Sequence, residues 1–211
     1  MRLTAQEVID RVATAYATCG TYRDTGCVRV VTQSGGVETL SERPFSTAFV
    51  RPDRFRFAFT SESVAGKPDL RYVICREGKA VRTWWDLRPG VERPADLEDA
   101  LSTAKGASGR ASHTVPALLL PKETHKSLTA LTGLKRLGDA KADRRDCFRL
   151  DGVYGITPLS FWIDKESLLL LKVEEYWKSS DGRVVRTATT TYDPTVDGEV
   201  GVKLLEFDPP K

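Results

Sequence analysis

The sequence predicts an α+β protein that is mainly β, built on one antiparallel sheet of about nine to eleven strands. Residues 161–177 hold two runs of strand-forming residues around a polar turn at 164–167, which is typical of a β-hairpin. The run 54–59 alternates strictly, so Phe55, Phe57 and Phe59 share one face. We expect a sheet of this width to curl, because strands twist.

A single helix is expected before the sheet, over residues 4–19. Thr4 and Glu7 have the spacing of a capping box, in which each side chain satisfies a free backbone N–H of the other. Apolar residues recur at helical spacing through this segment, and Gly20 ends it.

The remaining predicted strands are joined by short turns rich in Gly, Asp, Ser and Pro, so most should pair in chain order. They cover residues 27–32, 37–40, 45–50, 70–75, 79–85, 134–137, 146–150, 159–164, 168–177, 184–192 and 202–207.

The middle of the chain changes character and predicts a helical lid, residues 94–131. Helices are expected over 94–104 and 112–120, and their apolar residues need a partner, which the concave face of the curled sheet supplies. The loop 102–112 between them is rich in glycine, so we expect little backbone pairing there and high mobility. No linker interrupts the chain, which indicates one domain over 1–211 with the lid as an insertion.

Composition excludes several function classes. The net charge is +3, and the basic residues are spread along the chain rather than clustered, which argues against a nucleic-acid binder. The longest strongly apolar run, 168–171, is far below the roughly 18 residues of a transmembrane helix. Met1 leads directly into the first helix without a secretory signal, so we expect either a cytosolic protein or a mature form. Nothing indicates an oligomer, and a monomer is expected.

The four cysteines are Cys19, Cys27, Cys75 and Cys147. None forms a C-x-x-C pair, which zinc sites usually show. Isolated cysteines are most often small buried hydrophobic residues, although a Cys19–Cys27 disulfide stays open.

Catalytic and metal chemistry are poorly supported. His113 lies beside Ser112, but the chain has no G-x-S-x-G elbow, and a polar loop explains these residues better. An enzyme would have to combine His113 with Arg54, Arg56 or Arg82. Two histidines without clustered carboxylates, His113 and His125, make a weak metal site. We therefore expect no catalysis, no metal and no cofactor.

Three phrases of the sequence resemble the LolA/LolB-like outer-membrane lipoprotein carrier superfamily. They are the strand entry Arg51-Pro52-Asp53-Arg54-Phe55-Arg56-Phe57, the hairpin Glu77-Gly78-Lys79-Ala80-Val81-Arg82 and the hairpin Trp162-Ile163-Asp164-Lys165-Glu166-Ser167-Leu168-Leu169-Leu170. The order of helix, strands, mid-chain helices and strands also matches over nearly the whole chain. The resemblance implies an incomplete β-barrel that holds acyl chains under a helical lid, and a place in the periplasm or cell envelope.

The chain departs from the family pattern in places. It shows neither an export signal nor an acylated N-terminal cysteine, and the Trp84-Trp85 pair and the loop 102–112 have no counterpart. These departures favour a carrier-like member over the lipoprotein chaperone itself.

The preferred hypothesis is therefore non-catalytic binding or transport of a lipid or lipoprotein acyl chain in a concave apolar cavity. The expected ligand-binding residues are Phe55, Phe57, Phe59, Phe161, Leu169 and Leu171 on the floor and Val115, Leu118 and Leu119 on the lid. The alternative is a sensor or scaffold domain that binds a protein partner in an envelope-associated complex. An open apolar cavity would favour the first, and a close-packed interior with an exposed apolar patch would favour the second.

Overall fold

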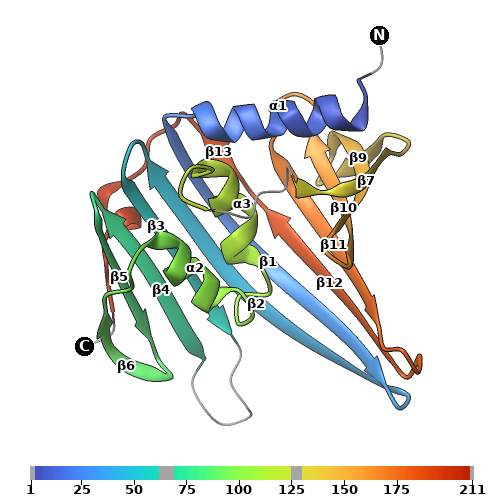
Figure 1. The fold of residues 1–211 in the computed structure, drawn as a ribbon, viewed down its shortest axis with the longest axis horizontal. Coiled ribbons are helices and arrows are strands. Elements are labelled where there is room, and N and C mark those ends of the chain that lie inside the picture. The colour runs from blue at the N-terminus through green and yellow to red at the C-terminus, as the bar shows by residue number, and fades with distance from the viewer. Residues whose placement is uncertain (1–2, 62–68, 125–129, 210–211) are drawn as a thin grey trace.

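The computed structural model describes residues 3–61, 69–124 and 130–209. Its centre is a strongly curved antiparallel sheet that does not close into a barrel, so the predicted fold class is confirmed. One long helix lies along one end of the sheet, and two short helices lie against its concave face (Figure 1).

The sheet follows the order β6-β5-β4-β3-β2-β1-β12-β11-β10-β9-β7, with β8 and β13 paired beside this path. Neighbours in sequence are therefore mostly neighbours in space, as predicted. The exceptions are β7 with β9, β1 with β13, and β1 with β12, the last of which joins the two halves of the chain. The strands are β1 Thr21–Ser34, β2 Val37–Val50, β3 Arg54–Ser61, β4 Leu70–Glu77, β5 Ala80–Trp85, β6 Arg88–Glu92, β7 Thr132–Arg136, β8 Ala140–Ala142, β9 Arg145–Tyr154, β10 Thr157–Asp164, β11 Leu170–Lys178, β12 Val184–Tyr192 and β13 Thr195–Val196.

The first helix, α1, spans Ala5–Thr18 and begins with the predicted capping box between Thr4 and Glu7. Its buried face includes Tyr16, whose hydroxyl accepts a hydrogen bond of 3.0 Å from the backbone N–H of Leu170. Arg51, at the end of β2, donates to the carbonyls of Tyr16 and Cys19. These bonds fix α1 across the end of the sheet.

The two lid helices are α2, Leu97–Ala104, and α3, Ala111–Leu119. Asp96 caps α2 by accepting from the backbone N–H of Asp99, which starts this helix later than predicted. Both helices bury their apolar residues in the same hydrophobic cluster as the sheet, so they cover the concave face as expected.

The prediction of a strand over 202–207 was wrong. Val202–Leu205 forms a short 3-10 helix, and the tail crosses the outer face of the sheet. Arg56 reaches out from β3 and donates to the Glu206 carbonyl at 3.0 Å and to the Asp208 carboxylate at 2.8 Å. Side-chain bonds of this kind attach the tail without any ladder of backbone pairs.

Cys19 is a thiol whose Sγ donates to the carbonyl of Tyr16 at 3.2 Å. The disulfide with Cys27 that the sequence left open is therefore not formed. Cys75 and Cys147 are buried, as expected of small hydrophobic residues.

Candidate ligand-binding site

Aromatic side chains form a continuous row across the concave face. Successive ring centroids lie 5.5 to 6.2 Å apart. The row runs through Tyr192, Phe45, Phe57, Phe59, Tyr72 and Trp85. It forms the greater part of an apolar floor, and the strict alternation of β3 is what places its two central rings on this face.

Gly26 lets this row cross β1 without a break. Gly26 pairs with Phe45 on one side and with Tyr192 on the other. A Cβ atom at this position would lie 2.3 Å from Cζ of Phe45, so no other residue leaves room for the ring. Because Gly26 has no side chain, the rings of Phe45 on β2 and Tyr192 on β12 meet across β1.

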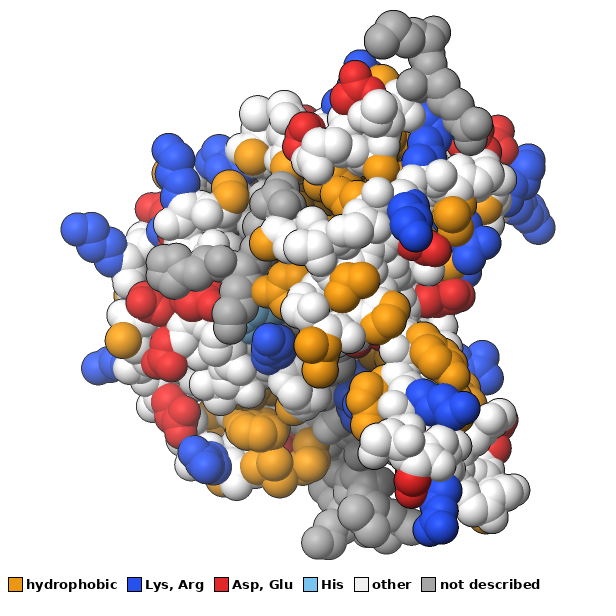
Figure 2. Space-filling model, turned by 45° about the vertical axis from the view of Figure 1, so that its right-hand side comes forward, with side chains coloured by type: hydrophobic (Ala, Val, Ile, Leu, Met, Phe, Trp, Pro, Cys, Tyr) orange, Lys and Arg blue, Asp and Glu red, His pale blue; other side chains and the backbone are white. Residues whose placement is uncertain are grey.

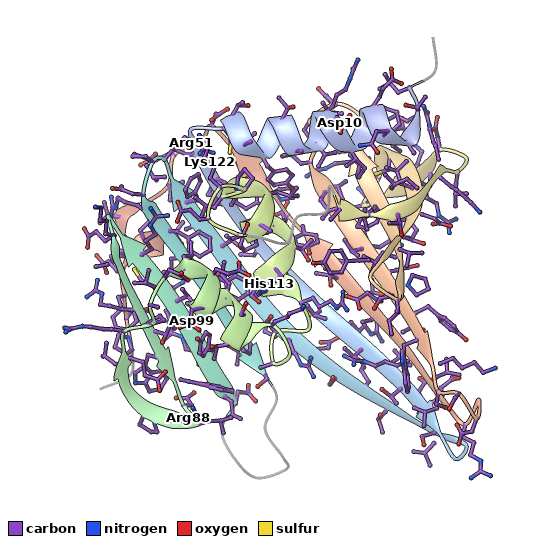
Figure 3. The ribbon with its side chains drawn as sticks, in the orientation of Figure 1. Asp10, Arg51, Arg88, Asp99, His113 and Lys122 are labelled. Atoms are coloured by element: carbon purple, nitrogen blue, oxygen red, sulfur yellow. The ribbon has the colours of Figure 1, made fainter. Side chains whose placement is uncertain are left out.

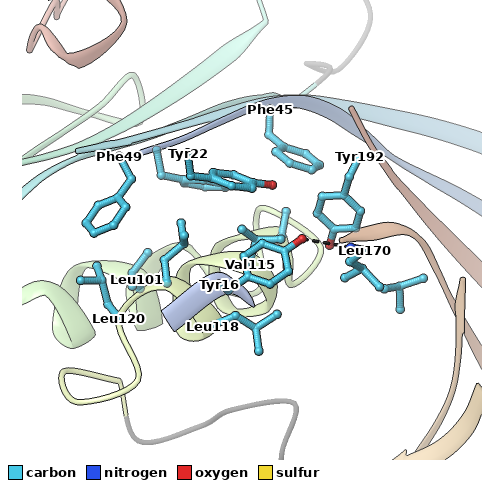
Figure 4. Close-up of a cluster of buried hydrophobic side chains, with 14 of the residues drawn as sticks. Tyr16, Tyr22, Phe45, Phe49, Leu101, Val115, Leu118, Leu120, Leu170 and Tyr192 are labelled. Atoms are coloured by element: carbon cyan, nitrogen blue, oxygen red, sulfur yellow. Dashed lines mark hydrogen bonds between the residues drawn. The ribbon is translucent and has the colours of Figure 1, made fainter. Parts of the chain in front are cut away.

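The predicted floor and lid residues largely meet. Phe55, Phe57, Phe59, Phe161 and Leu169 are buried in one cluster that also contains the lid residues Val115, Leu118 and Leu119. Figure 4 shows Val115 and Leu118 in one cluster with Tyr16 of α1 and the sheet side chains Tyr22, Phe45 and Phe49. In this conformation the lid side chains themselves occupy the concave face.

Leu171 is the exception among the predicted floor residues. A β-bulge between Trp162 and Ile163 of β10 leaves Leu171 of β11 without a partner in the ladder. Alternation is interrupted there, because a bulge places two successive residues on one face. Leu171 packs instead with Cys147 and Trp162 in a second cluster, apart from the lid.

A buried carboxylate lies among these apolar side chains. Asp24 of β1 accepts hydrogen bonds from the Tyr22 hydroxyl at 2.9 Å and from the Thr47 backbone N–H at 2.9 Å. Burial raises the pKa of Asp24 to about 6, although both hydrogen bonds oppose the shift. No pattern in the sequence predicts this buried carboxylate, since a lone Asp in a strand usually faces solvent.

A pocket of about 310 Å³ opens at the edge of the lid, and we call it the lid-edge pocket. The lid loop forms one side, and β10, β11 and β12 form the other. Its lining residues are Lys105, Gly106, Gly109, Arg110, Thr157, Glu175, Trp177, Arg186 and Ala188. The described structure thus offers a mixed polar and apolar entrance beside the covered face.

The loop between the lid helices is more ordered than the sequence predicts. Ser108 and Ser112 are fully buried, and the Ser112 hydroxyl donates to the Leu101 carbonyl at 3.0 Å. Backbone bonds join Ser108 to Ala104 and Arg110 to Lys105. The expectation of little backbone pairing over 102–112 was therefore wrong, and the high mobility expected there stays a prediction.

His113 lies between α2 and α3 (Figure 3). Its Nδ1 is 3.2 Å from the Ser112 hydroxyl, and its Nε2 is 3.3 Å from the Ser102 hydroxyl and 3.8 Å from a Glu98 carboxylate oxygen. A triad needs the serine and the carboxylate on opposite ring nitrogens. Ser112 and Glu98 do lie on opposite ring nitrogens, but Ser112 is fully buried and its hydroxyl donates to the Leu101 carbonyl. The Ser112 hydroxyl is therefore not placed to attack a substrate, and the arrangement joins the two helices.

The arginines that an enzyme would need do not reach His113. Arg56 binds the C-terminal tail on the outer face, and Arg82 lies 4.9 Å from the ring of Phe207 in the same tail. Arg54 shares the strand face of Arg56 by alternation. The other predicted histidine, His125, lies outside the described residues.

The described part of the chain shows neither a metal-site cluster nor a membrane-spanning helix. It holds no group of three or more His, Cys, Asp or Glu side chains placed to bind a metal ion. No helix within the same residues is long and apolar enough to span a bilayer.

The fold defines the class to which the site belongs, an open half-barrel with a helical lid. No protein-family model and no curated sequence matches the chain. Several solved structures do match this chain in fold. MucB is 15% identical with a TM-score of 0.50, and the match covers 97% of this chain but only 62% of MucB. LprF from Mycobacterium bovis is 13% identical with a TM-score of 0.49, over 94% of this chain and 95% of that chain.

A LolA superfamily protein, NE2245 from Nitrosomonas europaea, is 12% identical with a TM-score of 0.36, over 98% of this chain and 99% of that chain. Identities this low concern the fold alone. The MucB match, with a TM-score of 0.50, shows that this chain shares the fold of that protein.

Proposed function

We propose that this protein binds the acyl chain of a lipid or lipoprotein between the aromatic floor and the lid, without catalysing a reaction, as a carrier of the cell envelope. The observation that supports this most is the single apolar cluster shared by sheet and lid. The floor residues are Phe55, Phe57, Phe59, Phe161 and Leu169, and the lid residues are Val115, Leu118 and Leu119.

The lid packs on the sheet through apolar side chains and a few polar contacts. The described hydrogen bonds between them include Tyr72 to the Ala100 carbonyl, at 3.4 Å, and Arg51 to the Leu119 carbonyl, also at 3.4 Å. Arg110, at the start of α3, also donates to the Thr157 hydroxyl at 3.2 Å and pairs with Glu175. Apolar contacts are not directional, so an acyl chain can replace the lid side chains against the floor. Each buried methylene contributes about 0.8 kcal/mol, so about ten of them offset the usual cost of association.

The test compares two leucine truncations that remove the same atoms from different clusters. Leu118→Ala opens space beneath the lid, whereas Leu171→Ala opens space in the second cluster on the other face. Each should cost about 2–4 kcal/mol of unfolding free energy. We expect delipidated wild type to bind palmitate saturably, and Leu118→Ala to bind it more tightly because a ligand fills an apolar cavity.

Leu171→Ala is the matched control and should bind palmitate as the wild type does. Saturable binding that neither truncation changes would place the ligand away from the lid. No saturable binding by the delipidated protein, to palmitate or to a lipopeptide, would reject the function.

A second function has two observations in its favour. The lid side chains themselves occupy the concave face in this conformation, as a close-packed interior requires. Several apolar side chains on the long hairpins are about half exposed, including Leu40, Tyr176 and Trp177. Exposed apolar side chains suit a sensor or scaffold domain that binds a protein partner in an envelope-associated complex. Under that function the lid stays closed over its own side chains, and the palmitate titration shows no binding.

A further inference from the structure

The lid-edge pocket carries an excess of positive charge. Among the described residues that line it, Lys105, Arg110 and Arg186 are cationic and Glu175 is the one carboxylate. Arg110 faces that carboxylate, with Nε 3.4 Å from Oε2, and also donates to the Thr157 hydroxyl at 3.2 Å. Glu175 also interacts electrostatically with Lys105 and Arg186, so one carboxylate is shared among three cations that line the pocket.

A further guanidinium lies directly behind the loop. Within the described structure, Nη1 of Arg43 is buried and has no hydrogen-bond partner. It lies 3.2 Å from the position that a Cβ of Gly109 would take, so it adjoins the pocket lining. Arg43 does not itself line the pocket, but its positive charge lies directly beside the lining and adds to the attraction for an anion there.

The positive charges of Arg43 and Arg186 also repel each other. Burial lowers the pKa of Arg43, and the positive charge of Arg186 lowers it further. Like charges at one site favour a counter-ion between them. Because arginine presents a planar fork of donors, the matching acceptors are the paired oxygens of a carboxylate or a phosphate.

The remaining wall is apolar and leads inward. Trp177 lies opposite Arg186 in the β11–β12 ladder, and Ala188 lies two residues further along the same face of β12, where it belongs to the main apolar cluster. The pocket therefore combines a cationic lining with an apolar wall that leads to the main cluster. This combination matches the junction between the headgroup and the chain of an amphiphile.

Resting on the proposed function, we propose that the lid-edge pocket binds the anionic headgroup, carboxylate or phosphate, of the amphiphile whose acyl chain lies beneath the lid. The cations at the pocket fix the direction in which the chain enters. They also select acidic amphiphiles over neutral ones of equal chain length.

The test uses three probes with the same hydrocarbon chain of about 16 carbons: palmitate, hexadecyl phosphate and neutral monopalmitin. This length exceeds the roughly ten methylenes that binding requires. At low salt we expect the two anions to bind wild type about tenfold more tightly than monopalmitin, and the difference to shrink as salt screens the charges. Arg186→Gln should weaken both anions about fivefold and leave monopalmitin within about twofold.

The matched control is Arg29→Gln, an exposed arginine on the opposite face of the sheet, which should change none of the three affinities. Tighter binding of palmitate alone would assign the pocket to free carboxylates, and tighter binding of hexadecyl phosphate alone would assign it to phosphate headgroups. Equal affinity for all three probes, unchanged in Arg186→Gln, would overturn the headgroup site and leave acyl binding intact. Failure of every probe to bind would overturn both.

Discussion

At the scale of single residues, Asp24 is the least expected feature of the floor. Its carboxyl is buried beside Tyr22 and Thr47, and its pKa is raised from 3.8 to about 6. A raised acid pKa means that the folded state holds the proton more tightly than the unfolded state does. The stabilising effect of that proton is present at low pH and is lost as pH rises through about 4 to 6.

We predict that Asp24→Asn removes this loss. The shift of about two units corresponds to about 3 kcal/mol, so the variant should gain up to this amount relative to wild type as pH rises from about 4.5 to 7. Its amide oxygen still accepts from Thr47, and the Tyr22 hydroxyl can rotate to accept from the amide. Urea unfolding of both proteins across this pH range measures the difference. A difference that stays constant with pH would contradict the burial effect.

Residue patterns predicted which side of the sheet most of the buried side chains face, and they failed at Leu171 and Arg43. Strict alternation was enough to place Phe55, Phe57 and Phe59 inside. It misplaced Leu171, because a bulge is a feature of pairing between two strands and leaves no mark in one of them. It also missed Arg43, since the cost of burying an arginine argues for solvent unless the partner elements are known.

At the scale of elements, Gly109 allows the lid loop to approach β1 closely. Its φ is +60°, and an added Cβ would lie 2.8 Å from Cγ1 of Val28. Gly106, in the same loop, would meet nothing within 4 Å. Gly109 is therefore a closely packed position of the loop, whereas Gly106 is an open one.

We predict that Gly109→Ala destabilises the loop and Gly106→Ala does not. The first substitution combines an unfavourable φ with a clash and should cost about 1–3 kcal/mol, whereas the second should stay within about 0.5 kcal/mol. Amide hydrogen exchange across 102–112 measures the effect, with faster exchange expected only in Gly109→Ala. Equal exchange in the two variants would mean that the loop is not seated on Val28.

Elements with local signals were predicted well, and those that depend on distant partners were not. The capping box located the start of α1, and turn residues located the β10–β11 hairpin. The tail over 202–207 looked like a strand from its apolar residues, but Arg56 and Arg71 hold it through Asp208 instead. Segments 37–40 and 45–50 proved to be one strand, β2, because Pro44 pairs with Cys27 without ending it.

At the scale of the whole molecule, the sheet and the lid form a half-barrel with two different faces. The concave face is apolar and covered by α2 and α3 (Figure 1). The surface in Figure 2 shows hydrophobic side chains interspersed with separate basic and acidic ones, in keeping with the mixed charge of the sequence. The pairing of β1 with β12 joins the two halves of the sheet, and only long-range register could reveal it.

The central claim is that an acyl chain lies between floor and lid, and photo-crosslinking tests it most directly. A fatty acid with a diazirine in mid-chain is bound to the delipidated protein, irradiated and mapped by peptide mass spectrometry. We predict crosslinks to the β3 peptide that contains Phe55, Phe57 and Phe59 and to the α3 peptide that contains Val115 and Leu118, with unlabelled palmitate competing. Crosslinks confined to the outer face, at Tyr176 or Leu40, would contradict the account.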